Sequence, residues 1–383
     1  MRDIIVTGLQ SWDIGIGSNC KDIAQEFSKK CRVLYVNRAY DRKTILQSKL
    51  GKKGYTRRGV LTEVSSTFWV YTPKTIFDSI NWLKSSKLYD FIASRNGKAW
   101  AKEIEEVVNQ LGLQEPTLFI DNDFLRGSFY AKYYPYKSLI YYIRDNLLTQ
   151  SYFQKHGKRL EKRIIKSADF VLANSVYLSE YAKKYNPKSY YIGQGFDQNI
   201  FLNIPEKSGL LEHMTTPIIG YIGNITSERI DVSLLEKVAT ENPEWSFVFV
   251  GPEDRRFKES SLHGLANVFF VGKVSPEQVP MYINACDVCI NPQIVNEMTI
   301  GNYPRKVDEY LAAGKPVVAI KTLAMLPFEK HVYLANGYQD FADYVAKALE
   351  DNNDSLENKR KQFANEHTWE NSVSKIYEHV EID

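Results

Sequence analysis

Residues 291–320 read NPQIVNEMTIGNYPRKVDEYLAAGKPVVAI, and this stretch decides the fold. It opens at the end of a short apolar run, passes through a loop that contains Gly301, and continues into a predicted helix over about 304–313. The β-branched run at 315–320 follows at once. A strand, a helix and a second strand in this order form a βαβ unit, which requires a parallel sheet.

The start of the predicted helix can hold an anion. Pro304 suits the first position of a helix, where the free N–H groups and the positive end of the helix dipole can receive a diphosphate. Arg305 and Lys306 add positive charge at the same point. This helix terminus therefore predicts a diphosphate-binding site.

The same alternation of strands and helices extends in both directions along the chain. Strands are predicted at 4–8, 32–37, 117–121, 138–143 and 169–175, and again at 217–224, 245–252, 267–274, 287–292 and 315–320. Helices are predicted at about 18–30 and 149–167, and at about 230–241, 276–284, 304–313 and 338–350. We therefore expect an α/β fold with two doubly wound parallel sheets.

The length of the chain predicts two domains. One hydrophobic core rarely serves 383 residues. Residues 203–217, with two prolines and mixed polarity, have linker character. We expect Rossmann-like domains over 1–205 and 206–359, and we expect a C-terminal helix over about 360–383 to pack back on the first domain.

The charge is divided unevenly between the two halves. Residues 1–205 hold 32 Lys and Arg against 19 Asp and Glu, a net charge of +13. The remainder holds 49 − 32 = 17 basic and 46 − 19 = 27 acidic residues, a net charge of −10. A basic first half is suited to an anionic lipid surface, a diphosphate-bearing ligand or nucleic acid. No nucleic-acid recognition motif accompanies it, so we expect no nucleic-acid partner.

Nothing in the sequence indicates export or a membrane span. The start MRDIIVTGLQSWDIG predicts a first strand and not a signal sequence, and no run reaches the ~18 apolar residues that cross a bilayer. The four cysteines are too few for a disulfide scaffold, and we expect them to stay reduced. The sequence predicts a cytoplasmic protein, at most peripheral at the inner face of the membrane.

Residues 41–92 admit two interpretations. Residues 41–59 carry seven basic residues and one acid, and residues 75–92 mix apolar side chains with lysines. One interpretation is a solvated loop followed by a helix packed on the core. The other is a platform for an anionic membrane surface or an acceptor, because a basic amphipathic segment binds headgroups and buries its apolar side chains in the interface.

The stretch 291–320 resembles the donor-site segment of group 1 glycosyltransferases with the GT-B fold and of their bacterial polysaccharide relatives. The matching pattern is Pro304, Lys306, Glu309, Tyr310, Leu311, Ala312, Gly314, Lys315, Pro316, Val317 and Val318. Residues 220–235, 245–252, 267–292 and 363–378 also resemble segments of that family, in the same order. In the first half, 138–146 and 168–185 do so less specifically.

This resemblance implies two Rossmann-like domains that face each other across a cleft, with the nucleotide-sugar held by the second. It implies transfer of a sugar from a nucleoside-diphosphate sugar to a hydroxyl of a saccharide or a lipid-linked oligosaccharide in polysaccharide synthesis. It also implies no metal and no cofactor. The helix terminus with Arg305 and Lys306 fits such a reaction, because the departing diphosphate gains negative charge in the transition state.

The resemblance implies that Glu309 hydrogen-bonds the ribose hydroxyls of the nucleotide. In the common pattern of two glutamates separated by seven residues, the first glutamate would fall at 301, where this chain has Gly301. Glu297 lies four residues earlier, so the donor-sugar contact is not carried over to it.

Other donor-site candidates follow from the predicted strand ends. Gly223 and Asn224 end one strand, and a glycine there lets the backbone approach a ligand closely. Gly251 and Pro252 end another strand at the same carboxyl edge, where open α/β sheets bind ligands, and we expect them to border the base. Arg229 is either a second diphosphate ligand or a surface charge.

The first strand-to-helix loop, GLQSWDIGIGSN over 8–19, is a weaker signal. Gly15 and Gly17 form only a G-x-G, and Cys20 stands where a dinucleotide motif would have its third glycine, so a dehydrogenase is poorly supported. In GT-B enzymes this loop touches the donor phosphates or the acceptor. Asp13 therefore stands where a proton acceptor could act.

An inverting transfer needs a base to take the proton of the attacking hydroxyl. Asp145 is our first candidate, because YYIRDN resembles a segment of related inverting polysaccharide transferases. Asp13 is second, and Asp121 with Asp123 is third. Each carboxylate has a structural alternative, either as a helix N-cap or as an ion-pair partner, for example Asp145 with Arg144.

Two rival functions stay open at this point. A nucleotide-sugar epimerase of the same fold would react with the donor alone. A non-catalytic protein that binds nucleotide-sugars or glycans would lack turnover, and the absent first glutamate suggests it. Cys286 and Cys289 form a C-x-x-C without a second pair or nearby histidines, so they predict buried packing and no metal site.

Overall fold

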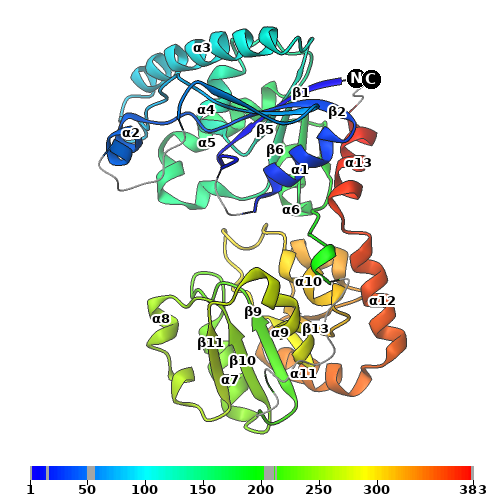
Figure 1. The fold of residues 1–383 in the computed structure, drawn as a ribbon. Helices are drawn as coiled ribbons and strands as arrows, with labels where there is room; N and C mark the ends of the chain where they lie inside the picture. Colours follow the sequence, from blue (N-terminus) through cyan, green and yellow to red (C-terminus); the bar gives the residue numbers. More distant parts are fainter. Residues whose placement is uncertain (1, 14–16, 50–56, 202–210, 212–213, 381–383) are drawn as a thin grey trace. The chain divides into compact units, whose positions relative to one another are not determined.

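The structure is a computed structural model that describes residues 2–13, 17–49, 57–201, 211 and 214–380. It divides into two compact units (Figure 1). Unit 1 is Met1–Gly193 with Ser372–Asp383, and unit 2 is Gln194–Asn371. The division thus falls at 193/194 and 371/372, whereas the sequence placed it near 205. Most of the expected linker at 203–217 lies outside the described residues.

Unit 1 is built on an eight-stranded sheet in the order β3-β4-β2-β1-β5-β6-β7-β8. Every neighbouring pair is parallel except β3 with β4 at the edge. The strands are β1 Arg2–Gly8, β2 Cys31–Val36, β3 Val60–Ser65, β4 Phe68–Thr72, β5 Thr117–Asp121, β6 Leu139–Ile143, β7 Phe170–Ala173 and β8 Ser189–Tyr191. The five strands expected in this half are confirmed, and β3, β4 and β8 extend the sheet.

The helices of unit 1 begin where side chains can cap them. Ser18, Ser85, Asp123 and Ser175 each accept a hydrogen bond from a backbone N–H three residues later, which replaces a bond that the first turn lacks. The helices are α1 Asn19–Ser28, α2 Arg42–Lys49, α3 Ser86–Gln110, α4 Phe124–Tyr130, η1 Leu147–Thr149, α5 Ser151–Ser167 and α6 Val176–Lys183.

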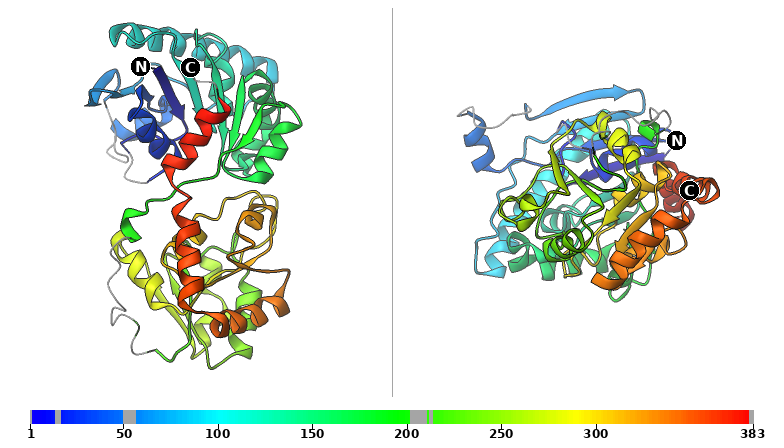
Figure 2. Two further views of the ribbon diagram at one scale, coloured as in Figure 1. Left: turned by 90° about the vertical axis from the view of Figure 1, so that its right-hand side faces the viewer. Right: turned by 90° about the horizontal axis from the view of Figure 1, so that it is seen from below.

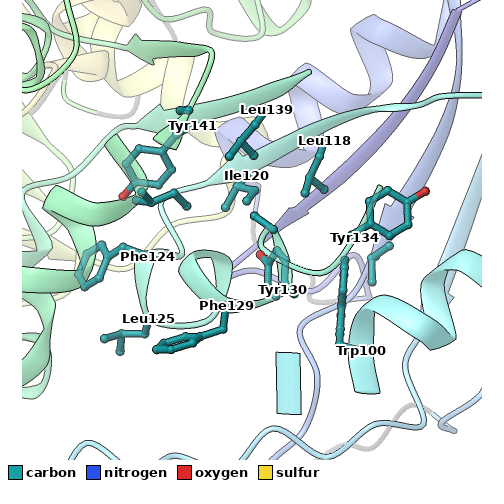
Figure 3. Close-up of a cluster of buried hydrophobic side chains, with 14 of the residues drawn as sticks. Trp100, Leu118, Ile120, Phe124, Leu125, Phe129, Tyr130, Tyr134, Leu139 and Tyr141 are labelled. Atoms are coloured by element: carbon teal, nitrogen blue, oxygen red, sulfur yellow. The ribbon is translucent and has the colours of Figure 1, made fainter. Parts of the chain in front are cut away.

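The core of unit 1 follows the alternation of side chains along β5. Leu118 and Ile120 point to a face covered by α3, α4 and α5, where the rings of Trp100 and Tyr130 stack with centroids 4.2 Å apart (Figure 3). Phe119 points to the other face and meets Phe27 of α1 at 5.6 Å. A strand buried on both faces needs a continuous apolar run, and β5 supplies one at its centre with Leu118, Phe119 and Ile120.

The secondary structure of residues 41–92 differs from the loop followed by a helix that one interpretation expected. Residues 42–49 form the helix α2 where a loop was expected, and the helix expected over 75–92 begins only at Ser86. The backbone at 75–85 is irregular, and the N–H of Phe77 donates to the carbonyl of Tyr40. Phe77, Ile80 and Leu83 are buried at a three-residue spacing that is typical of a helix, although the backbone there is not helical. Tertiary contacts, and not the packing of one helical face, bury these side chains.

Unit 2 is built on a six-stranded parallel sheet in the order β11-β10-β9-β12-β13-β14. Its strands are β9 Ile218–Ile222, β10 Ser246–Val250, β11 Val268–Gly272, β12 Val288–Asn291, β13 Val317–Ile320 and β14 Tyr333–Ala335. Along β10, Val248 and Val250 join one core cluster while Phe247 and Phe249 join another. Helices therefore cover both faces, as a doubly wound sheet requires.

The helical segments of unit 2 close these two faces. They are η2 Asn199–Phe201, α7 Val232–Glu241, α8 Arg255–Lys258, η4 Ser261–Gly264, η5 Pro276–Gln278, α9 Val279–Ala285, α10 Arg305–Ala312, η6 Leu323–Phe328, α11 Tyr338–Asp351 and α12 Asp354–Asn365. Cys286 and Cys289 are buried free cysteines, and the Cys286 thiol donates to the carbonyl of Tyr282. The expectation of buried packing for this pair is confirmed.

The helix α13, Trp369–His379, begins in unit 2 and ends in unit 1 (Figure 2). Its Tyr377 ring lies 5.9 Å from the ring of Phe27, and its hydroxyl lies 3.4 Å from the Cys31 sulfur. The ring of His379 stacks on Tyr190 at 4.3 Å. These contacts attach α13 to the same face of the unit 1 sheet that α1 covers.

Candidate active site

Two glycine turns meet at the carboxyl edge of the unit 2 sheet. Gly223 follows β9 with φ +147°, and Gly251 follows β10 with φ +145°, values that favour glycine. A β-carbon at Gly251 would lie 1.9 Å from the carbonyl oxygen of Gly223. The Gly223 N–H donates to Val250 at 2.8 Å, and the Ile225 N–H donates to Pro252 at 2.9 Å. The two predicted strand ends therefore pack together and form one backbone surface.

The first turn of α10 lies against this surface. Its N-cap is Pro304, whose side chain forms no cap, and the Val307 N–H donates back to the Pro304 carbonyl at 2.8 Å. The Lys306 Cε atom lies 3.1 Å from the position of a β-carbon on Gly223, and its Nζ lies 5.1 Å from the centre of the Tyr221 ring. Lys306, Gly223 and Gly251 are thus brought together, as an oxyanion site needs.

Arg305 and Glu309 form a pair on the same face of α10. The Arg305 Nε lies 3.3 Å from the Glu309 Oε1, a distance that makes an ion pair, yet this buried Nε forms no hydrogen bond within the described part of the chain. Burial raises the pKa of Glu309, while Arg305 and Lys306 act in the opposite direction. With its side chain 19% exposed, Glu309 can still receive a hydroxyl donor.

The loop before α10 is fixed by hydrogen bonds. Thr299 is buried, and its backbone carbonyl accepts from the Gln293 side chain at 2.8 Å. The N–H of Ile294 donates to the carbonyl of Arg229 at 2.9 Å, which ties the turn after β9 to this loop. The Arg229 side chain is exposed, so its two interpretations both stay open. Gly301 is buried and Glu297 is exposed.

A buried pair that the sequence analysis missed lies behind α10. Asp308 is fully buried, and its Oδ1 lies 2.5 Å from Nδ1 of His367, a residue between α12 and α13. Burial raises the pKa of Asp308, and the contact with His367 opposes that shift. The pair fixes the helix α10 to the C-terminal segment. The only signal in the sequence was an acid on the inner side of an amphipathic helix.

In unit 1, Arg144 joins two of the candidate bases. Its Nε lies 3.0 and 3.1 Å from the carboxylate oxygens of Asp121, and its Nη1 lies 3.1 Å from Oδ2 of Asp145. Asp121 is fully buried, whereas the Asp145 side chain is 39% exposed. The buried Asp121 raises the pKa of Arg144, so the guanidinium stays charged. Asp145 is therefore the member of this group that a ligand could reach.

The other candidates of unit 1 lie apart from this group or perform structural roles. Asp13 is exposed and accepts from the Asn37 side chain at 3.0 Å. Asp123 is buried and caps α4 through the Arg126 N–H at 3.2 Å, the structural alternative named above. Gly17 is exposed, and Gly15 lies outside the described residues.

A cavity in unit 1 was not anticipated from the sequence. It has a volume of about 620 Å³ and is lined by Leu9, Ser11, Arg38, Ala39, Tyr40, Asp41, Lys43, Thr44, Gln47, Ser79, Arg126, Tyr152 and Phe153. These residues come from five segments: the loop after β1, residues 38–47 into α2, the irregular stretch that contains Ser79, α4 and α5. No local pattern could have grouped them.

Two general searches complete the description. Among residues 2–13, 17–49, 57–201, 211 and 214–380, no three His, Cys, Asp or Glu side chains are grouped so that they could hold a metal ion. Within the same ranges, no helix is both long enough and apolar enough to cross a bilayer.

The comparisons with known proteins agree with this geometry. Residues 216–351 match the family model described as Glycosyl transferases group 1. TuaH of Bacillus subtilis (strain 168), a protein named as a glycosyltransferase of teichuronic acid biosynthesis, is 30% identical over 242 residues. That similarity covers 59% of this chain and 60% of TuaH. The chain thus spans about three fifths of the length of this curated relative.

Solved structures show the same fold over nearly the whole chain. Sucrose-phosphate synthase of Thermosynechococcus elongatus superposes with a TM-score of 0.70 at 14% identity and covers 99% of this chain and 98% of its own. Anabaena Alr3699/HepE, solved with UDP and glucose, gives 0.67 at 17% identity with 99% of both chains covered. The chain therefore has the GT-B fold, and its residues 216–351 are similar to the group 1 glycosyl transferases.

Proposed function

We propose that the chain transfers a sugar from a nucleoside-diphosphate sugar to a hydroxyl of a saccharide or lipid-linked oligosaccharide in polysaccharide synthesis. The observation that carries this proposal is the contact between Lys306, in the first turn of α10, and the turn at Gly223, which itself packs on the turn at Gly251. Two glycine turns, a helix N-terminus and Lys306 come together there. Such a site stabilises the charge that develops on a departing diphosphate.

We assign the parts of the donor to named groups. The diphosphate lies at the start of α10, where Arg305 and Lys306 neutralise it. Glu309, one turn further along, accepts hydrogen bonds from the ribose. Pro252 borders the base. UDP is the nucleotide of choice, since Alr3699/HepE was solved with UDP, with UDP and glucose, and with UDP-glucose.

Protein cations supply the leaving-group stabilisation in this proposal, so no metal is required. The matched test is the release of UDP in buffer with excess EDTA and in buffer with magnesium. Equal initial rates support the proposal. A rate that disappears in EDTA and returns with magnesium contradicts this part of it, while the transferase assignment stands.

Asp145 is the proposed base if the product anomer is inverted. Its Oδ2 pairs with Nη1 of Arg144 at 3.1 Å, and Asp121 on the other side of Arg144 fixes the guanidinium. A carboxylate that is both charged and accessible can accept the proton of an attacking hydroxyl. The stereochemistry of the product, read by NMR from the anomeric coupling, decides whether a base is needed.

Calorimetric titration with UDP, GDP and ADP, followed by an assay of diphosphate release, tests the function. We expect one nucleotide to bind in the micromolar range and its sugar derivative to be consumed only with an acceptor. Consumption of the donor without an acceptor would favour the epimerase, and binding without turnover would favour the non-catalytic protein. The comparisons support neither alternative. No uptake of any nucleotide would refute the proposal.

We further propose that unit 1 contacts an anionic membrane surface through residues 41–92. The helix α2 carries Arg42 and Lys43 beside Leu46, which is 61% exposed, and Trp82 and Phe91 are 71% and 68% exposed. Cations attract anionic headgroups, and exposed apolar side chains enter the interface. We expect the protein to float with anionic vesicles but not with zwitterionic ones. The double variant Leu46→Ser/Trp82→Ser should no longer float with anionic vesicles. No flotation with anionic vesicles would remove this part.

A further inference from the structure

The 620 Å³ cavity of unit 1 contains an unusual pair of cations. Arg126, from α4, has a side chain only 9% exposed, and its guanidinium lies 5.6 Å from the centre of the Phe77 ring. Arg38, from the segment after β2, lines the same cavity. It forms no hydrogen bond or ion pair with any of the residues that the structure describes. A half-buried guanidinium without a partner is costly unless a ligand supplies one.

The two guanidinium groups repel each other. Arg126 is the main cause that lowers the pKa of Arg38, and burial adds to it. Asp123, Tyr152 and Asp41 act in the opposite direction but do not cancel the shift. Two like charges in one cavity destabilise the empty protein, and an anion between them would reverse the sign of that interaction.

The nearby carboxylates are already engaged. Asp41 accepts from the Thr44 N–H and from the Ser79 hydroxyl, both at 2.7 Å. Asp78, which lines a smaller adjoining cavity, pairs with Arg42 at 3.2 Å. Asp123 caps α4 and lies 3.5 Å from the guanidinium of Arg126.

The lining of the main cavity consequently carries an excess of positive charge. It contains Arg38, Arg126 and Lys43 against the single carboxylate of Asp41. Arginine presents a fork of donors that matches a phosphate or a carboxylate, and two of them match the two charges of a phosphoryl group better than the one charge of a carboxylate.

The volume and the remaining lining indicate what the phosphoryl group is attached to. Pockets for small molecules measure roughly 300–1,000 Å³, so this cavity is much larger than a phosphate ion needs. Tyr152 and Phe153 supply aromatic surface, and Ser11, Thr44 and Gln47 supply neutral polar groups. Aromatic faces with hydroxyl and amide groups suit a sugar ring.

We propose that this cavity binds the phosphoryl group of a phosphorylated saccharide acceptor between Arg38 and Arg126. The proposal rests on the glycosyltransferase function proposed above and names the class of its acceptor. The phosphoryl group belongs either to a soluble sugar phosphate or to a lipid-linked one. Leu46, Trp82 and Tyr152 are exposed apolar side chains on segments that line the two cavities. The tail of a lipid-linked acceptor would pass these side chains as it extends out of the cavity.

Arg38→Gln is the decisive variant, because Arg38 has no hydrogen bond or ion pair to lose among the residues that the structure describes. Inorganic phosphate is titrated at constant ionic strength into the full-length protein and into Arg38→Gln, Lys306→Gln and Arg95→Gln. Arg95 is an exposed arginine of α3 outside both cavity linings and serves as the matched control. We expect phosphate affinity to fall at least about tenfold in Arg38→Gln and to persist in Arg95→Gln, while Lys306→Gln identifies any phosphate that binds at the donor site.

The thermal midpoint adds a second readout. Without ligand, Arg38→Gln should unfold at the same temperature as the wild type or at a higher one, because the repulsion with Arg126 is gone. Phosphate should raise the midpoint of the wild type and raise that of Arg38→Gln much less. Equal phosphate affinity in the wild type and Arg38→Gln, or no phosphate binding at all, overturns the proposal.

Two further experiments distinguish a soluble from a lipid-linked phosphate, and this inference from the proposed glycosyltransferase function. A soluble sugar 1-phosphate and vesicles that carry a polyprenyl phosphate are compared, and binding of either one that depends on Arg38 supports the inference. Binding of neither overturns it. UDP titration of the same proteins reports on the donor site. If the wild type does not bind UDP, the proposed function is refuted. If the wild type binds UDP but not phosphate, only this inference is refuted.

Discussion

Glu161, in α5, gives the sharpest test of the energetics of unit 1. Its carboxyl is 2% exposed and accepts one hydrogen bond, from the Tyr181 hydroxyl at 2.9 Å. Burial raises the pKa of Glu161 from 4.5 to about 7, and the Tyr181 bond opposes this. Since the folded carboxyl holds its proton more tightly than the unfolded one, stability falls as pH rises from about 4.5 to about 7 and then levels off.

The size of the effect follows from this shift. A change of one unit corresponds to about 1.4 kcal/mol, so the charged carboxylate costs unit 1 about 3 kcal/mol at pH 8 and under about 1 kcal/mol at pH 5. Glu161→Gln keeps an oxygen for the Tyr181 hydroxyl and removes the charge. We expect the variant to be about 3 kcal/mol more stable than the wild type at pH 8 and nearly equal to it at pH 5.

Urea unfolding at the two pH values measures this difference, with hydrogen exchange of α5 peptides identifying the transition of unit 1. Glu180→Gln is the control, because Glu180 is 60% exposed and pairs only with Lys183 on the surface. Its effect should stay within about 0.5 kcal/mol at both pH values. A wild type and a Glu161→Gln variant with the same pH dependence would refute the reasoning.

Three further predictions concern the candidate site. Gly251→Ala should destabilise unit 2 by at least about 2 kcal/mol in urea unfolding, because its β-carbon would meet the Gly223 carbonyl at 1.9 Å and its φ is +145°; an unchanged midpoint would contradict the geometry. Lys306→Gln should weaken UDP binding about 10- to 100-fold by calorimetry, with Lys273→Gln unaffected. Asp145→Asn should lower turnover by about 10²- to 10⁴-fold and leave UDP binding intact. If Asp13→Asn shows that loss and Asp145→Asn does not, the base has been assigned to the wrong residue.

The sequence predicted the elements whose side chains repeat with a regular period. The strand β10 reads SFVFV and is buried on both faces, and the helix α10 follows its predicted bounds within one residue. Glycines at strand ends were also informative, since Gly223 and Gly251 have backbone angles that favour glycine. In each case the information lies within a few neighbouring residues.

What the sequence did not predict depends on contacts between distant residues. Phe77 and Ile80 imitate a helix, but the bonds of Phe77 to Tyr40 and of Ser79 to Asp41 hold an irregular backbone. The pairing of Asp308 with His367 spans 59 positions. The cavity that contains Arg38 and Arg126 is lined by five separate segments of the chain. The neighbours of either arginine in the sequence therefore do not identify it as a cavity residue.

The course of α13 has a consequence for how the protein is made. Unit 1 is discontinuous in sequence, because residues 372–380 complete a face formed by Phe27, Cys31 and Tyr190. On the ribosome, all of unit 2 must emerge before that face can be covered. Unit 2 is continuous and can finish folding first, although most of unit 1 is synthesised earlier. Nascent chains halted after residue 371 should therefore hold unit 1 in an incomplete form that chaperones recognise.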